Sequence, residues 1–241
     1  MTLRKILATS RSSLACGSLA ALVAGLACTA AAAEDAVPAN TLRVGMYFVK
    51  YNASAADLSG PFTPPHINLR VDHVNTPYFA YLRRLSSSLE LELAAGVPPK
   101  THTRGVGPAT LGSVPFNGVE VATAKWFSPT LLLEYKFFDE HNALRPYIGI
   151  GMNYTHFYDR ESTAAGNAAN GGSTKTYLSD SFGPAGTLGV AYRINKNFNA
   201  IASYSIAQVN SNYDSITAGI SRTTVVHFNP GTWVVAAGYS F

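Results

Sequence analysis

The stretch Ile148-Gly149-Ile150-Gly151-Met152-Asn153-Tyr154-Thr155 alternates strictly between large, mostly apolar residues and small or polar ones. A period of two places successive side chains on opposite faces, which is the pattern of a β-strand with one apolar face. The same alternation recurs in residues 89–95, 131–137 and 233–241. The sequence therefore predicts a protein built mainly from β-strands.

The composition narrows the kind of β-protein. The chain has 241 residues, of which 47% are hydrophobic and only 13% charged, whereas an ordinary soluble domain carries about a quarter charged residues. Its mean hydropathy is nonetheless close to zero. That is too low for a bundle of membrane helices, because each needs about 20 largely apolar residues. A closed β-barrel in a membrane fits both observations, since its strands alternate apolar and polar residues.

Residues 1–33 have the organisation of a secretory signal peptide: a basic start, an apolar run and three alanines before a cleavage point after Ala33. This segment holds three of the 18 Lys and Arg residues, so 15 remain against 14 acidic ones. Bulk charge therefore gives no case for a nucleic-acid partner. Both cysteines, Cys16 and Cys28, leave with the segment. The mature chain, residues 34–241, is expected to form a single barrel domain without disulfides.

Eight alternating segments follow in the mature chain. They are residues 41–51, 74–85, 88–97, 126–138, 143–158, 180–194, 197–214 and 222–241. Long loops are expected at residues 52–73, 98–125 and 159–179, with a shorter loop near residues 215–221. An even number of strands, with short turns at one end and long loops at the other, is typical of outer-membrane barrels. We predict an all-β, eight-stranded antiparallel transmembrane β-barrel, with its termini and short turns in the periplasm and its long loops outside the cell. A soluble β-sandwich or lipocalin-like barrel is the disfavoured alternative.

Aromatic residues on the outward faces gather at both ends of the strands. The periplasmic group is Tyr135, Phe137, Tyr192, Phe198, Tyr239 and Phe241, and the outer group is Phe48, Phe127, Tyr154, Tyr158, Phe182 and Trp233. Two belts of this kind are expected where lipid meets water.

The inward positions near the periplasmic end are charged. Alternation assigns to them Arg43, Arg83, Glu90, Glu92, Glu134, Lys136, Arg145 and Arg193. Arg83 is expected to face Glu90 across the hairpin at Ser86-Ser87. Side chains fill the interior of an eight-stranded barrel, and charges in so narrow a space must pair because an unpaired buried ion is costly. We interpret these residues as a plug against ion flow, although simple packing of the lumen requires the same residues.

The inward positions near the outer end carry no charge. They are Tyr51, Trp126, Thr155, Phe157 and Phe228. We expect them to form an apolar funnel that opens between the loops and admits a small hydrophobic molecule, which leaves sideways through the barrel wall into the bilayer. Pro129, Gly183-Pro184 and Pro230 are expected to weaken the strand ladder where such an exit forms. Core filling without any cargo is the simpler alternative.

Several motifs resemble the OmpW family of outer-membrane proteins. They are Arg145-Pro146-Tyr147-Ile148-Gly149-Ile150-Gly151-Met152-Asn153-Tyr154-Thr155, Ser128-Pro129-Thr130-Leu131, Asp180-Ser181-Phe182-Gly183, and the ending from Asn229-Pro230 to Gly238-Tyr239-Ser240-Phe241. The likeness spans the mature chain. It implies a place in the outer membrane of a Gram-negative bacterium, contact with its lipid and lipopolysaccharide, and passage of small hydrophobic compounds. Phe241 also resembles the terminal signal that the barrel-assembly machinery reads.

Two other classes of function remain as alternatives. A lipid-modifying enzyme needs a nucleophile, a base and an acid close together. His227 is the one histidine expected to point inward, and no Ser or Asp stands at a spacing that marks a triad with it, so no catalytic residue is assigned. Paired metal ligands are absent, and no helix start follows Gly149-x-Gly151, so no metal or cofactor is expected. A structural or receptor-type barrel, whose loops bind a phage or bacteriocin, is the second alternative. Residues 164–172, small and polar, offer such a partner no aromatic or Arg anchor.

Overall fold

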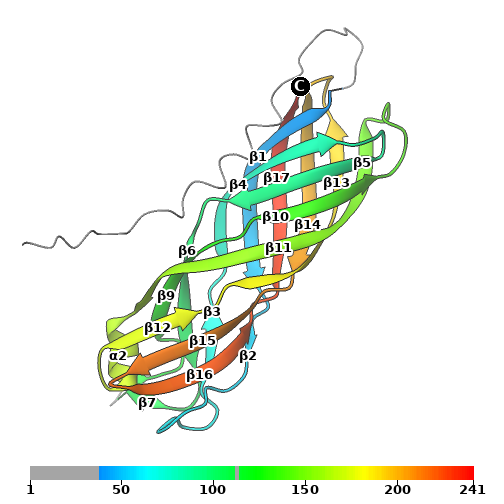
Figure 1. Ribbon diagram of the computed structural model, residues 1–241. Helices are drawn as coiled ribbons and strands as arrows, with labels where there is room; N and C mark the ends of the chain where they lie inside the picture. Colours follow the sequence, from blue (N-terminus) through cyan, green and yellow to red (C-terminus); the bar gives the residue numbers. More distant parts are fainter. Residues whose placement is uncertain (1–37, 112–113) are drawn as a thin grey trace, which may run out of the picture. The chain divides into compact units, whose positions relative to one another are not determined.

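The computed structural model describes residues 38–111 and 114–241, so the predicted signal peptide lies outside the described residues. The described residues belong to one compact unit. This unit is a closed antiparallel β-barrel that continues at one end into a second, strand-rich region, which we call the extension (Figure 1). Within the described residues, no helix is long and apolar enough to cross a membrane.

Eight strands close the barrel. They are β1 (Asn40–Tyr51), β4 (Val74–Arg84), β5 (Leu89–Gly96), β10 (Thr130–Lys136), β11 (Leu144–Ser162), β13 (Ser181–Arg193), β14 (Phe198–Ala207) and β17 (Pro230–Ser240). Each pairs antiparallel with the barrel strand before it along the chain, and β1 pairs with β17 to complete the ring. Short turns join the strands at the end where the C-terminus lies, which we call the turn end (Figure 1). The predicted all-β, eight-stranded barrel is confirmed.

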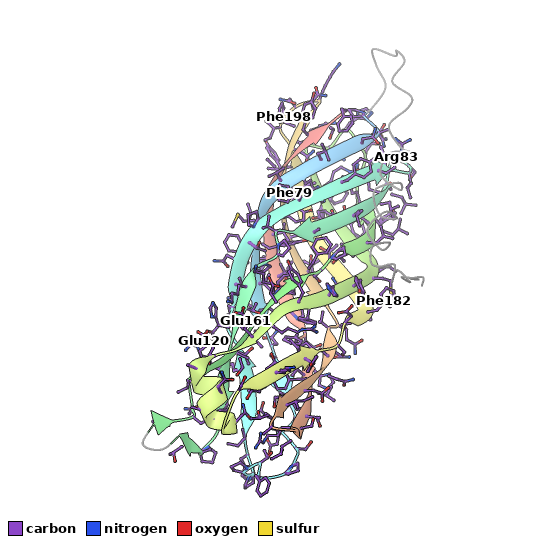
Figure 2. The ribbon with its side chains drawn as sticks, turned by 60° about the vertical axis from the view of Figure 1, so that its left-hand side comes forward. Phe79, Arg83, Glu120, Glu161, Phe182 and Phe198 are labelled. Atoms are coloured by element: carbon purple, nitrogen blue, oxygen red, sulfur yellow. The ribbon has the colours of Figure 1, made fainter. Side chains whose placement is uncertain are left out.

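Residues that alternate in hydrophobicity along the sequence also alternate between exposed and buried positions in the barrel. In β11, Ile148 and Ile150 are exposed on the outside, while Tyr147 and Asn153 are buried in the lumen. Ten of the twelve aromatic residues predicted for the two belts are likewise exposed, and Phe127 and Tyr158 are half-buried. Figure 2 shows Phe198 at the turn end and Phe182 nearer the extension. An exposed apolar band of this kind is stable where lipid covers it.

The extension is built from the segments predicted to be long loops together with the outer ends of the segments predicted as strands at residues 126–138, 197–214 and 222–241. Its elements are β2 (Ser54–Ala55), β3 (Asn68–Val71), β6 (Lys100–Val106), β7 (Thr110–Leu111), β8 (Val114–Pro115), β9 (Glu120–Phe127), α2 (Ala164–Asn170), β12 (Thr174–Leu178), β15 (Asn210–Thr217) and β16 (Ile220–His227). Strands β3, β6 and β9 continue onto the outer half of β11, and β12, β15, β16 and β2 form a separate sheet. The segments predicted as long loops, residues 52–73, 98–125 and 159–179, therefore contain short strands and a helix, whereas the shorter loop predicted near residues 215–221 is the turn between β15 and β16. Buried apolar residues of the extension, such as Leu69, Tyr213 and Val226, pack into one core.

Helix α2 occupies most of the segment predicted as a small polar loop, residues 164–172. The side chain of Thr163 caps its first turn by accepting a hydrogen bond from the Gly166 N–H, and Gly171 ends it in the left-handed conformation at φ 79°. A Cβ on Gly166 would lie 2.0 Å from the Val121 carbonyl oxygen, so glycine permits the close approach of helix and strand. The alanines favour this helix, and caps and packing compensate for the low helix propensity of its glycine and asparagines.

Candidate functional site

A cavity with an empty volume of about 930 Å³ lies within the barrel, and we call it the chamber. All five residues predicted to line a ligand path are among its walls: Tyr51, Trp126, Thr155, Phe157 and Phe228. The Phe157 and Phe228 rings stack with centroids 5.3 Å apart. These two side chains are only 4% and 7% exposed, because the extension packs over them in a shared core. The rings of the predicted funnel thus lie beneath the extension, and an opening of the chamber between the loops stays a prediction.

The middle of the chamber is lined by hydroxyl and amide groups, which we call the hydroxyl belt: Ser128, Thr130, Asn153, Thr155, Thr187 and Ser205. The Asn153 amide nitrogen donates to Ser128 Oγ and Thr130 Oγ1, at 2.8 Å each. Ser205 Oγ donates to Thr187 Oγ1 at 2.9 Å. Sequence reasoning assigned only Thr155 to the path. The others on β10, β11, β13 and β14 follow the inward parity of their strands, which is the signal that identifies them.

A buried ion cluster closes the chamber toward the turn end. We call it the floor, formed by Arg43, Tyr78, Glu92, Glu134 and Tyr147. Arg43 Nη1 lies 2.5 Å from Glu92 Oε2 and 3.5 Å from Glu134 Oε1. The Tyr78 hydroxyl donates to Glu92 at 3.0 Å, and the Arg43 guanidinium lies 5.7 Å from the Tyr147 ring centroid. The Arg43 and Glu134 residues are 2% and 1% exposed, so the cluster fills its section of the lumen.

Small neighbours make room for these large side chains. Arg43 pairs with Gly238 on β17 and with Ala80 on β4, so neither adjacent strand places a bulky side chain beside it. Glu134 pairs with Gly149 on β11, where an added Cβ would lie 3.3 Å from the Glu134 Cγ and 2.8 Å from the Thr187 Cγ2. Gly149 therefore serves packing of the lumen.

The remaining predicted charges lie closer to the turn end, and one prediction is wrong. Strand β5 places Arg84, not Arg83, opposite Glu90. Arg83 has the outward parity and donates to Asn40 Oδ1, because β4 turns the apolar Leu82 into the lumen. Figure 2 shows Arg83 at the turn end of the barrel.

The other three cations differ in their partners. Lys136 pairs with Glu90 at 2.7 Å, and both side chains are largely buried. Arg145 donates to the Ser87 carbonyl at 2.8 Å, and Arg193 donates to the Glu140 carbonyl at 2.9 Å. The last two thus bind turn backbone at the rim rather than carboxylates of the floor. The part of the predicted plug that lines the chamber is therefore Glu92 and Glu134, with Arg43 between them behind the wall.

The barrel wall has a gap near Pro129. Strand β10 pairs with β5 up to Thr130↔Ala94, and pairing of β9 with β6 begins only at Lys125↔Lys100. Between these two ladders, no backbone pair joins residues 95–99 to residues 126–129. Three of these residues are proline, which has no N–H to donate.

The other predicted weak points differ from this gap. The β13–β14 ladder starts at Ala185↔Ala207, so Gly183-Pro184 does adjoin a break on that side. The Gln208 N–H still donates to the Pro184 carbonyl at 3.0 Å. Pro230 is the first residue of β17 and forms the last pair of the β1–β17 ladder, opposite Tyr51, while the β14–β17 ladder already stops at Ile206↔Gly231. Pro230 therefore lies at the end of the ladders, where a missing N–H interrupts the fewest hydrogen bonds.

A seam also separates the outer half of β11 from β12. The β11–β13 ladder ends at Thr155↔Ser181, and no ladder joins β11 to β12 in the described part of the chain. Asp180 bridges the seam instead: it accepts from the Tyr154 hydroxyl at 2.6 Å and lies 2.9 Å from His156 Nδ1. Sequence reasoning did not single out this aspartate, because its partners lie more than twenty positions earlier.

The titration of Asp180 gives a test of the seam. Partial burial opposes ionisation of the carboxyl, but hydrogen bonds from Tyr154, His156 and the Phe157 N–H outweigh it and lower its pKa. A lowered pKa in the folded state stabilises the fold at pH values above the unfolded value, near 3.9, and this contribution is lost as the pH falls through the folded value. We expect Asp180→Asn to speed hydrogen exchange of the Phe157 amide at pH 7, by a local destabilisation of up to about 1 kcal/mol.

The control for this prediction is Asp159→Asn. Asp159 also pairs with a side chain of the extension, Lys125 at 3.0 Å, but it does not bridge the seam. Its φ of 46° is one that asparagine accepts. The control should leave exchange at Phe157 unchanged, and the effect of Asp180→Asn should shrink as the pH falls below the unfolded pKa and through the lowered folded one. Equal exchange in Asp180→Asn and the parent at pH 7 would contradict the bridging role.

The histidines do not assemble a hydrolytic site in the described residues. His227, predicted to point inward, is exposed and lies 2.7 Å from Asn210 Oδ1, because the inward positions of β16 are Thr224 and Val226. The hydrogen bonds of His156 within residues 38–111 and 114–241 go to Asp180, and none joins it to a serine hydroxyl. No group of three potential metal ligands lies together in this part of the chain.

The comparisons with known proteins agree with this architecture. A model of the OmpW family matches residues 41–241. Outer membrane protein W of Salmonella typhimurium is 30% identical over 163 residues, which are 68% of this chain and 70% of that protein. The crystal structure of outer membrane protein OprG from Pseudomonas aeruginosa superposes with a TM-score of 0.76 at 22% identity, covering 85% of this chain and 96% of that one. The structure of outer membrane protein AlkL gives a TM-score of 0.63 at 18% identity, covering 88% and 95%.

The family match begins at residue 41, one residue after the start of β1, and includes all the other barrel strands in full. The structural likeness extends over most of the extension. These relatives are named as outer-membrane proteins, and the apolar outer band of the barrel described above is what such a location requires. The chain therefore belongs to the OmpW family and is an eight-stranded β-barrel protein of the outer membrane.

Proposed function

We propose that the protein is a narrow conduit that takes small hydrophobic molecules from outside the cell and releases them sideways into the bilayer. The observation that carries the proposal is the chamber itself, which is apolar beneath the extension and ends on an ion cluster. A cavity that ends blindly at charged groups suits a cargo that leaves before it reaches them. In this proposal the extension faces outward, and the turn end and both termini of the mature chain are periplasmic.

The floor supports closure to ions. Arg43 and Glu134 are both nearly inaccessible, and Arg43 Nη1 lies between Glu92 Oε2 and Glu134 Oε1, at 2.5 and 3.5 Å. A hydrated ion would have to break this cluster and leave buried charges without partners, which is unfavourable by several kcal/mol. We therefore expect the purified barrel to show little ion conductance in a planar bilayer.

The gap near Pro129 is the proposed exit. The chamber reaches this gap from inside, because Ala94, Trp126 and Ser128 line the chamber and border the unpaired residues. On the outside, Val97 is 45% exposed on the apolar surface. A break in the ladder between these residues leads from the chamber toward lipid without rupture of strand hydrogen bonds. We propose that lipid and lipopolysaccharide contact this outer band, and that Phe241 at the turn end is read by the barrel-assembly machinery.

Filling the chamber tests the conduit. Ala207 is an inward residue of β14 that lines the chamber. We expect Ala207→Trp to reduce uptake of a labelled, uncharged hydrophobic solute by Gram-negative cells to the level of cells without the protein, because the indole occupies the space that the cargo needs. Uptake is compared at matched outer-membrane levels of each variant.

The matched control is Ala202→Trp, the same change at another alanine of the same strand. Ala202 is exposed on the outer face of β14 and does not line the chamber, so the same indole is placed in lipid. Uptake by this variant should equal that of the parent. If parent cells take up the solute no faster than cells without the protein, the conduit is wrong and the structural or receptor-type barrel is favoured.

A further inference from the structure

Three residues that line the chamber have a buried polar atom without a hydrogen-bond partner among the described residues: the Tyr51 hydroxyl, the Trp126 indole nitrogen and Glu134 Oε2. Glu134 belongs to the floor, whereas Tyr51 on β1 and Trp126 on β9 lie within reach of each other, in a geometry too poor for the indole N–H to bond the hydroxyl. Buried tyrosine and tryptophan usually place their polar atoms against a partner. An unsatisfied buried donor is unfavourable, so a pair of them in a cavity wall marks a place where a ligand atom gains hydrogen bonds.

The chemistry of the pair defines the ligand atom. An indole N–H only donates, and a phenol hydroxyl has one proton to donate. The two donors together therefore suit one acceptor oxygen, such as that of a ketone, ester or alcohol. An ammonium group has no acceptor and gains nothing from either donor.

The surroundings of the pair exclude an anionic head group. No cation lines the chamber beside Tyr51 and Trp126, and of the ionisable residues in its walls, Glu92 and Glu134 are carboxylic acids. A carboxylate in the chamber would lose its hydration without gaining a counter-ion, which is unfavourable. The rest of the wall around the pair, Val49, Phe157 and Phe228 among others, is apolar and matches a hydrocarbon chain.

We propose that the chamber selects neutral amphiphiles, molecules that carry a hydrocarbon chain and one uncharged acceptor oxygen, and that Tyr51 and Trp126 bind this oxygen. The inference rests on the proposed conduit and specifies its substrate class. It assigns Tyr51 and Trp126 to recognition of the polar end and the stacked Phe157 and Phe228 rings to the apolar chain. A pure alkane of the same length fills the same space but leaves both donors unpaired, so it binds more weakly.

The two tryptophans of the chain make the test direct. Trp126 lines the chamber, whereas Trp233 is 52% exposed on the outer surface. In a Trp233→Phe background, Trp126 is the single fluorophore of its kind in the mature chain. This variant, folded in lipid nanodiscs free of detergent, is titrated with 2-octanone while Trp126 emission is recorded. Octane and octanoate are then measured as competitors.

We expect 2-octanone to give a saturable change that octane displaces weakly and octanoate does not displace. Tyr51→Phe, in the same background, should weaken 2-octanone binding by about threefold to tenfold, the loss of one hydrogen bond. Competition by octane should be unchanged, because the aromatic ring remains. Tyr213→Phe is the control: it removes another buried phenol hydroxyl, in the extension and outside the walls of the chamber.

The outcomes separate the two proposals. If octane competes as well as 2-octanone binds, and Tyr51→Phe changes neither, the polar subsite is wrong while the conduit stands. If octanoate competes best, the neutral head group is wrong. If none of the three molecules binds to a barrel whose circular dichroism shows native β-structure, both the subsite and the conduit are overturned. Loss of 2-octanone affinity in Tyr213→Phe as well as in Tyr51→Phe would also overturn the subsite, since the effect would then follow from general destabilisation.

Discussion

Replacement of Arg43 by methionine is expected to destabilise the barrel by about 3–5 kcal/mol. The substitution keeps much of the side-chain volume but removes the guanidinium that Glu92 and Glu134 share. Both carboxyl groups are then buried in the lumen, 5% and 1% exposed, with no cation between them. The free energy of unfolding is measured by urea titration of the protein refolded into lipid vesicles, at pH 7.

The variant Arg43→Met/Glu92→Gln/Glu134→Gln tests the reason for this loss. It removes the two carboxylates together with the cation, so no buried charge is left unpaired, and most of the lost stability should return. Glutamine keeps the shape of glutamate and an acceptor for the Tyr78 hydroxyl, which donates to Glu92 in the parent. An Arg43→Met protein as stable as the parent would show that the three groups do not form a buried ion cluster.

The barrel was predictable from sequence because each of its strands has one face in lipid and one in the lumen. Lipid accepts large apolar residues, such as Ile148 and Ile150, at every second position, and the resulting period of two is visible in the chain. The extension lacks this signal. Strand β3 is four residues long, and β6 reads KTHTRGV. Strand β3 pairs with β6 and β6 pairs with β9, partners that are distant in the sequence. A local sequence pattern does not predict such pairs.

The site was predictable to a similar extent. Parity on long strands placed Arg43, Glu92 and Glu134 in the lumen and grouped Tyr51, Trp126 and Phe228 around one space. Parity failed where a strand ends, since the adjacent Arg83 and Arg84 differ only in which of them follows Leu82 into the lumen. Strand parity also gave no information on how deeply an inward residue lies beneath the rest of the protein. Whether the aromatic rings of the chamber were exposed or buried depended on the extension, which packs over them.

Substitution of Gly151 by valine is expected to prevent closure of the barrel between β10 and β11. A Cβ at this position would lie 1.8 Å from the Leu131 carbonyl oxygen and 2.9 Å from the Leu132 Cα. Those atoms belong to the backbone of β10, so no side-chain rotation relieves the overlap, and the two strands must separate. The register from Thr130↔Asn153 to Lys136↔Tyr147 depends on their close approach. We expect a loss of at least about 4 kcal/mol, which is a large part of the stability of an ordinary domain.

Gly186→Val separates this steric effect from the low strand preference of glycine. Gly186 lies on β13, where an added Cβ would be 3.7 Å from the nearest atom, the Gly149 carbonyl oxygen. Its side chain has the outward parity of Leu188, which is 60% exposed, so valine there faces lipid. A β-branched residue favours a strand, and this variant should fold as well as the parent, as judged by urea titration in vesicles and by the gel mobility of the unheated protein. If Gly151→Val folds equally well, β10 and β11 do not approach as closely as the geometry requires. Loss of folding in Gly151→Val but not in Gly186→Val identifies the close approach of β10 and β11, rather than the low strand propensity of glycine, as the reason for the glycine at position 151.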